Sequence, residues 1–198
     1  MDKPAAPDHP IHELLVRRWS PRAFSDHLIE PDKIHSLLEA ARWSASSFNE
    51  QPWSFLIATR DDEALFSKAV SCLFEANQSW AQTAPLLILT TSKKSFSHNN
   101  KPNRVYLHDL GLAIGSLSLQ ATAMGLALHQ MAGVDVEKIR QLYDVPPDHD
   151  PITAIAVGYP GDPQQLPPKI REIEQSPRTR KSLSEFVFSG QFGTPAII

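Results

Sequence analysis

The sequence contains very little cysteine and no long hydrophobic run. Cys72 is its only cysteine, which excludes an internal disulfide and is typical of proteins from a reducing compartment. No segment reaches the roughly 18 consecutive apolar residues of a membrane-spanning helix, and the N-terminal MDKPAAPDHP lacks the apolar core of a secretion signal. We therefore expect a soluble cytoplasmic protein with no membrane partner.

A strong charge of one sign and several common catalytic motifs are also missing. The formal net charge is −3, so no overall basic field would attract nucleic acid, and we expect no such partner. The chain has no G-x-G-x-x-G, P-loop or G-x-S-x-G motif, and its eight histidines form no H-x-H or H-x-x-x-H pair. We expect no metal site. His129, inside an apolar strand, is interpreted as a structural or pocket-lining residue.

Hydrophobic patterns alternate between the helix period and short apolar runs. They predict helices at 31–43, 61–79, 104–125 and 136–145, strands at 54–59, 84–91, 126–131 and 153–159, and a last element at 182–188. Several connections are too short to cross over between parallel strands, which favours an α+β fold with a mixed, mostly antiparallel sheet between helices. Residues 1–10, rich in proline and alanine, are expected to form a flexible tail before a single domain at 11–198.

A stripe of small residues follows one face of the longest predicted helix. It consists of Gly111, Gly115, Ser118, Thr122 and Gly125. Each glycine inside a helix costs about 1 kcal/mol relative to alanine, so the stripe indicates close approach of another backbone. A two-fold interface and packing against a sheet both fit this pattern.

Two basic segments lie near opposite ends of the chain. RRWSPRAF (17–24) gathers three arginines around Ser20, and PRTRKSLSE (177–185) adds Arg178 and Arg180. Taken alone, each is as typical of a solvated surface as of an anion site. Two further segments are distinctive: SSFNEQPW (46–53), which follows the first long helix, and HQMAGVD (129–135), which follows the longest one.

In this order and spacing, the four segments resemble the FMN-dependent nitroreductase family. The resemblance covers about residues 11–188, and the four motifs together are far more specific than any one of them. It implies a nitroreductase-like three-layer fold with an extended C-terminal segment. The chain is compact for the family and lacks room for the helical insertion that shapes the substrate channel in larger members.

The resemblance also implies a set of FMN-binding residues. Arg18 and Ser20 would hold the phosphate together with Arg178 and Arg180, and Arg22 would point at the pyrimidine end of the flavin. Trp19 stands where many relatives carry a second cationic residue. The loop that lies along the flavin would comprise Ser46, Ser47, Asn49 and Gln51. In dimers of the family, parts of this loop reach the flavin that is bound mainly by the partner chain. The turn near flavin N5 would comprise Met131, Ala132 and Gly133.

The residue types suit this ligand. Guanidinium groups present a planar fork to a phosphate, and each charge-assisted hydrogen bond contributes roughly 1.5–3 kcal/mol. Three such bonds give about 6 kcal/mol, whereas nanomolar affinity needs about 12 kcal/mol. Burial of the flavin ring must supply the remainder, so we expect a deep, largely apolar slot.

The expected function is therefore an FMN oxidoreductase that takes hydride from NADH or NADPH and reduces nitroaromatics, quinones or similar small acceptors by a ping-pong mechanism. Flavin N5 would carry the chemistry, with Arg22 tuning it and Phe48 stacking on the acceptor. Two alternatives stay open: a flavoenzyme of the same fold with different chemistry (dehalogenation, dehydrogenation or flavin destruction), and a non-catalytic flavin-binding module. The resemblance further implies a homodimer.

Overall fold

The computed structural model describes residues 3–197 and contains one four-stranded sheet. The strands are β1 (Trp53–Thr59), β2 (Leu86–Lys93), β3 (Ala127–Met131) and β4 (His149–Gly158), in the order β1-β2-β4-β3. Each neighbouring pair is antiparallel, with a register shift between Thr90 and Thr91 in the β2–β4 pair. The expected α+β fold is confirmed.

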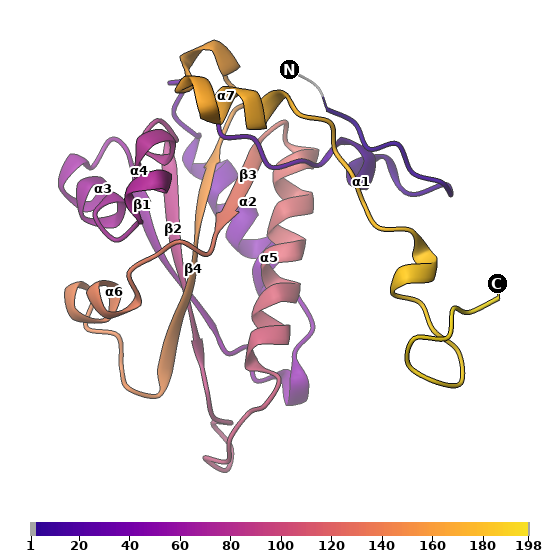
Figure 1. Cartoon of the computed structure of the whole chain (residues 1–198). Helices are drawn as coiled ribbons and strands as arrows, with labels where there is room; N and C mark the ends of the chain where they lie inside the picture. Colours follow the sequence, from indigo (N-terminus) through magenta and orange to yellow (C-terminus); the bar gives the residue numbers. More distant parts are fainter. Residues whose placement is uncertain (1–2, 198) are drawn as a thin grey trace.

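Helices cover both faces of the sheet and produce three layers (Figure 1). One face packs against α2 (Pro31–Arg42) and α5 (Tyr106–Ala123), and the other against α3 (Glu63–Val70), α4 (Glu75–Ala81) and α6 (Val136–Leu142). Side chains alternate along β2: Leu86 and Ile88 belong to the first core, Leu87 and Leu89 to the second. Burial on both faces explains why this strand reads as an uninterrupted apolar run.

The helix expected at 61–79 is divided into α3 and α4. The chain leaves helical geometry at residues 71–73, where Leu73 forms a bridge with Val134 and the Cys72 carbonyl accepts a 2.8 Å hydrogen bond from the Asp135 N–H. Because these pairings tie the break to the chain that follows β3, one continuous helix could not satisfy them. The helical pattern in the sequence does not reveal such a tertiary pairing.

Several short elements have no clear sequence signal. These are α1 (Glu13–Arg17), α7 (Pro168–Gln175) and the 3-10 turns η1 (Ser47–Asn49), η2 (Pro163–Gln165) and η3 (Leu183–Glu185). The last element, expected at 182–188, is reduced to η3. Beyond α7, the C-terminal arm (residues 177–197) leaves the body of the molecule and extends past α5 (Figure 1). The arm exposes Phe186 and Phe192.

Residues 3–12 contain no helix or strand, but they make specific contacts. The Lys3 ammonium donates to the carbonyls of Glu174 and Ser176, and the Ala5 N–H donates to the carbonyl of Val16 at 2.8 Å. The division into a flexible tail at 1–10 and a domain at 11–198 stays a prediction. Residues 3–5 nevertheless attach to α7 and α1.

No helix within residues 3–197 is long and apolar enough to cross a bilayer.

Candidate functional site

Three guanidinium groups gather beside α1. Arg18 follows this helix and donates from Nη1 to Ser20 Oγ at 3.3 Å. The pKa of Arg18 is lowered, first by burial and then by the positive charges of Arg178 and Arg180. The pKa of Arg178 is lowered by burial and by Arg180 in the same way. The chain therefore brings together four residues that the sequence predicts for a phosphate site.

This arginine cluster (Arg18, Arg178 and Arg180) has the electrostatics of an anion site. Within residues 3–197, no carboxylate forms an ion pair with any of the three. The cluster borders a cleft of about 920 Å³ between the N-terminal segment and the start of the C-terminal arm. Among the described residues that line it, Asp8 is the only acidic one, against four arginine and lysine side chains. Like charges held together without a counter-ion favour binding of a phosphate-sized anion.

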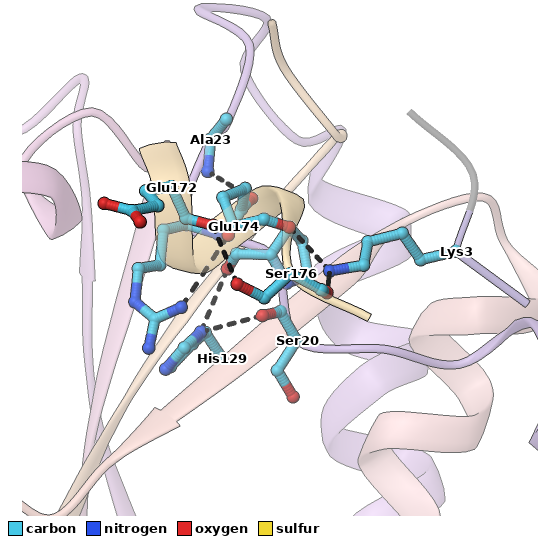
Figure 2. A network of polar contacts seen from close by, with 9 residues as sticks. Lys3, Ser20, Ala23, His129, Glu172, Glu174 and Ser176 are labelled. Carbon is cyan, nitrogen blue, oxygen red and sulfur yellow. Dashed lines mark hydrogen bonds and ion pairs between the residues drawn. The ribbon is translucent and has the colours of Figure 1, made fainter. Parts of the chain in front are cut away.

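Arg22 belongs to a polar network around the buried carboxylate of Glu174, and Figure 2 shows that this network also includes Lys3, Ser20 and His129. Glu174 Oε1 accepts from the N–H groups of Arg22 and Ala23 at 2.8 and 3.2 Å. Glu174 Oε2 has no hydrogen-bond donor within the described chain and lies 3.7 Å from Arg22 Nη1. Arg22 also faces the Trp80 ring, 5.9 Å from its centroid. The expected flavin-directed guanidinium is thus partly neutralised by a carboxylate that the sequence did not mark.

His129 holds the turn between the arginine cluster and Arg22. Its Nδ1 donates to the carbonyls of Ser20 and Pro21 at 3.0 and 3.1 Å, which fixes the tautomer with the proton on Nδ1 (Figure 2). Burial, assisted by the charge of Arg22, lowers the pKa of His129 to about 4. The ring is therefore neutral near pH 7 and has the structural role interpreted from the sequence.

The turn after β3 is held against α4. Met131 is buried at the end of the strand, and Ala132 is exposed. The Gly133 carbonyl accepts from the Phe74 N–H and from Asn77 Nδ2, both at 3.0 Å. A Cβ on Gly133 would lie 2.6 Å from Asn77 Nδ2, so glycine permits this close approach.

The predicted flavin loop is built from unusual backbone geometry. Phe48, Asn49 and Gln51 have φ values of 54°, 54° and 51°, in the left-handed region that such residues rarely occupy. Ser46 Oγ accepts from the Gln51 N–H at 3.0 Å, and the buried carboxylate of Asp109 accepts from the Ser47 N–H at 3.0 Å. The strain is held by these contacts at the N-terminal end of α5, and strained loops concentrate at functional sites.

Phe48 displays its ring to solvent, with 81% of the residue exposed. It contacts Phe96 edge to face, with ring centroids 5.6 Å apart, and lies 5.5 Å from the His98 ring. The Glu50 carboxylate ties the same loop to the hairpin at 94–102 by accepting from the Ser97 N–H and hydroxyl. The three rings form an aromatic surface that the sequence did not predict beyond Phe48.

The two halves of the predicted site lie at opposite ends of α5. Arg17, next to the arginine cluster, donates to the Thr122 carbonyl at 2.8 Å, whereas the flavin loop is attached at Asp109. These anchors are thirteen positions apart in the helix, or about 20 Å along its axis. One chain therefore brings together Arg18, Ser20, Arg178 and Arg180, and separately Ser46, Ser47, Asn49 and Gln51, but does not join the two groups.

Functional candidates that sequence reasoning missed are Lys3, Glu174 and Asp109. Lys3 is an ordinary residue near an N-terminus, Glu174 is one of several charged residues of α7, and Asp109 is a common type of residue in the first turn of a helix. Only their burial and contacts distinguish them. No group of His, Cys, Asp and Glu side chains within residues 3–197 is arranged to hold a metal ion.

Comparisons with known proteins show what the chain resembles in sequence and in fold. The sequence model of the nitroreductase family matches residues 15–159. The crystal structure of an FMN-containing oxidoreductase superimposes with a TM-score of 0.89 at 32% sequence identity, covering 95% of this chain and 96% of that one.

Two curated relatives extend the comparison. A 15.4 kDa uncharacterised protein of Mycolicibacterium smegmatis is 32% identical over 123 residues, which are 62% of this chain and 82% of that protein. The FMN reductase (NADPH) of Bacillus subtilis is 22% identical over 175 residues, which are 80% of this chain and 69% of that protein.

Proposed function

Since this chain belongs to the nitroreductase family, we propose that two copies of it enclose FMN and use NAD(P)H to reduce nitroaromatics, quinones or similar electron-poor acceptors by a ping-pong mechanism. The family and its members show that the chain is an NAD(P)H-dependent FMN oxidoreductase. The acceptors, the order of the two half-reactions and the dimer are the proposal. A buried, unpaired Cys72 is in keeping with a cytoplasmic location.

The residues present fit the FMN phosphate. The arginine cluster supplies three charged donors without a carboxylate partner in the described chain, and Ser20 Oγ already accepts from Arg18. Arg178 is oriented by carbonyl acceptors, so its guanidinium is held in place before an anion arrives. Preorganised donors cost less conformational entropy on binding than mobile ones. This uncompensated cluster is the single observation that carries the proposal.

When bound, the flavin supplies the hydride chemistry itself, while the chain orients it and sets its electrostatic surroundings. Arg22 provides a cation whose charge is shared with Glu174, and Trp80 and His129 border it with aromatic surface. The neutral His129 adds no charge near pH 7. In this proposal the residues tune and position the cofactor, and none acts as a general acid or base.

The aromatic surface around Phe48 favours acceptors that are planar. Rings at 5.5 and 5.6 Å from Phe48 form an exposed platform, and offset stacking on such a surface favours electron-poor aromatic compounds. Phe48 is 81% exposed, so its ring is accessible to a ligand. We propose that this platform stacks on the acceptor.

The separation of the two half-sites supports the dimer. A partner chain can bring its own flavin loop to the arginine cluster, whereas the loop of the same chain is anchored about 20 Å away along α5. The exposed face of α5 carries Leu107, Gly111, Leu112 and Gly115, and a Cβ added to either glycine would meet no other part of the chain within 4 Å. A second copy can therefore approach this face closely.

The test uses the full-length protein loaded with FMN under anaerobic conditions. Addition of NADPH or NADH should bleach the yellow absorbance, and a quinone or nitroaromatic should restore it repeatedly. Flavin that stays oxidised would indicate a non-catalytic flavin-binding module. Bleaching without turnover of any quinone or nitro compound would indicate other chemistry on the same cofactor.

A further inference from the structure

The N-terminal segment is fastened to the end of α7 by one side chain. Lys3 Nζ donates to the carbonyls of Glu174 and Ser176, both at 2.6 Å (Figure 2). These carbonyls belong to the last turn of the helix and its cap, where the helix dipole is negative and a cation is favoured. The same ammonium lies 5.3 Å from the ring centroid of Trp19. Trp19 stands between Arg18 and Arg22 in the phosphate turn (residues 18–22).

The backbone of this segment in turn orients an arginine of the cluster. Arg178 Nη1 donates to the Lys3 carbonyl at 2.6 Å and to the Val16 carbonyl at 3.2 Å. The Val16 carbonyl also accepts from the Ala5 N–H, so the N-terminal segment, α1 and Arg178 share one hydrogen-bonded junction. The position of the Arg178 guanidinium therefore depends on where Lys3 is held.

The same segment forms a wall of the phosphate cleft. Residues 5–9 line it on one side, with residues 178–183 of the C-terminal arm and Arg18 among its other lining residues. This part of the chain lies outside the segment at 15–159 that matches the family model.

We propose that residues 3–9 form a strap that completes the phosphate site and that Lys3 is its positioning residue. Lys3 does not contact the anion; it holds the carbonyl that orients Arg178. The proposal rests on the proposed function, because the anion is taken to be the FMN phosphate. It predicts an effect on ligands that carry the phosphate and none on ligands that lack it.

Two flavins and three variants test this role by quenching of flavin fluorescence at equilibrium. Lys3→Ala removes the anchor, Lys3→Arg keeps a cation that can reach the same carbonyls, and Lys101→Ala is a control in the exposed hairpin at 94–102. Lys3→Ala should raise the Kd for FMN about tenfold and leave the Kd for riboflavin within about twofold of wild type. Lys3→Arg should restore most of the FMN affinity, and Lys101→Ala should match wild type.

The outcomes separate this inference from the proposed function. Wild-type protein that binds FMN no better than riboflavin would overturn both, since no phosphate site would then exist. A wild-type preference for FMN that survives in Lys3→Ala would overturn the strap alone. Equal losses of affinity for FMN and for riboflavin in Lys3→Ala would show that Lys3 has only a structural role, and would also overturn the proposed strap. If Lys3→Ala perturbs folding, a variant that lacks residues 2–9 repeats the test. We expect this variant to lose affinity for FMN and to keep its affinity for riboflavin.

Discussion

His129 is a largely buried side chain that supports the backbone of residues 20 and 21 through hydrogen bonds, and its burial controls its protonation. It packs 4.7 Å from the Trp80 ring and donates to the two carbonyls that shape the phosphate turn. Because its environment disfavours the charged ring, His129 stays neutral in the folded protein at a pH where the same side chain already binds a proton in the unfolded chain. The stability of the phosphate turn is therefore linked to pH through this residue.

The sign of this linkage follows from the lowered pKa. His129 titrates at about 4 in the folded state, against an ordinary value of 6.5. Its contribution is complete above about pH 6.5 and is lost as the pH falls toward 4, because the unfolded state then takes up the proton. When the pH is lowered from 7 to 5, we expect protonation of His129 in the unfolded state to reduce the free energy of unfolding of the wild-type protein by about 2 kcal/mol.

Urea unfolding of wild type and His129→Asn at both pH values measures the effect. Asparagine keeps an N–H donor for the Ser20 carbonyl but does not titrate. The difference in stability between the two proteins should narrow by about 2 kcal/mol on acidification. A difference that does not change with pH would contradict the account of His129.

At the scale of helices and strands, much of the architecture was predictable from the sequence. The run at 84–91 indicated β2 because a strand buried on both faces must be apolar throughout, and the stripe at 104–125 indicated α5. The break between α3 and α4 was not predictable, because it depends on the pairing of Leu73 with Val134, far away in the sequence. The same limit applies to Glu174, whose role depends on tertiary contacts of a helix that reads as solvated.

The glycines of α5 support a specific prediction about assembly. Gly115 lies on an exposed helix face with open space where a side chain would begin, so Gly115→Leu introduces no clash at its Cβ within one chain. Leucine should even favour the isolated helix by almost 1 kcal/mol. If a second copy packs on this face, the added side chain should dissociate the dimer and release FMN together.

Sedimentation and flavin absorbance of Gly115→Leu check this expectation. Ala64→Leu provides the matched control, because it adds leucine to an exposed position of α3 in the opposite layer. Retention of both the dimer and the flavin in Gly115→Leu would show that this face is not the interface.

At the scale of the whole molecule, the two groups of residues predicted for the FMN site lie at opposite ends of α5. The arginine cluster and strap lie at the end of α5 that carries Thr122, and the strained flavin loop lies at the end that carries Asp109 (Figure 1). The C-terminal arm extends away from the body with exposed Phe186 and Phe192. Sequence motifs predicted both groups of residues, and the three-dimensional structure shows how far apart they lie in one chain.

Complementation between two defective chains tests this division most directly. One chain carries Arg18→Ala and Arg180→Ala in the phosphate half, and the other carries Asn49→Ala and Gln51→Ala in the loop half. Each variant alone should lose most of its bound FMN. A mixed dimer contains one intact site, built from the undamaged half of each chain, and should bind about one FMN with high affinity. The account would be contradicted by mixed dimers that bind no more FMN than the two parent homodimers, or by a wild-type monomer that binds FMN by itself.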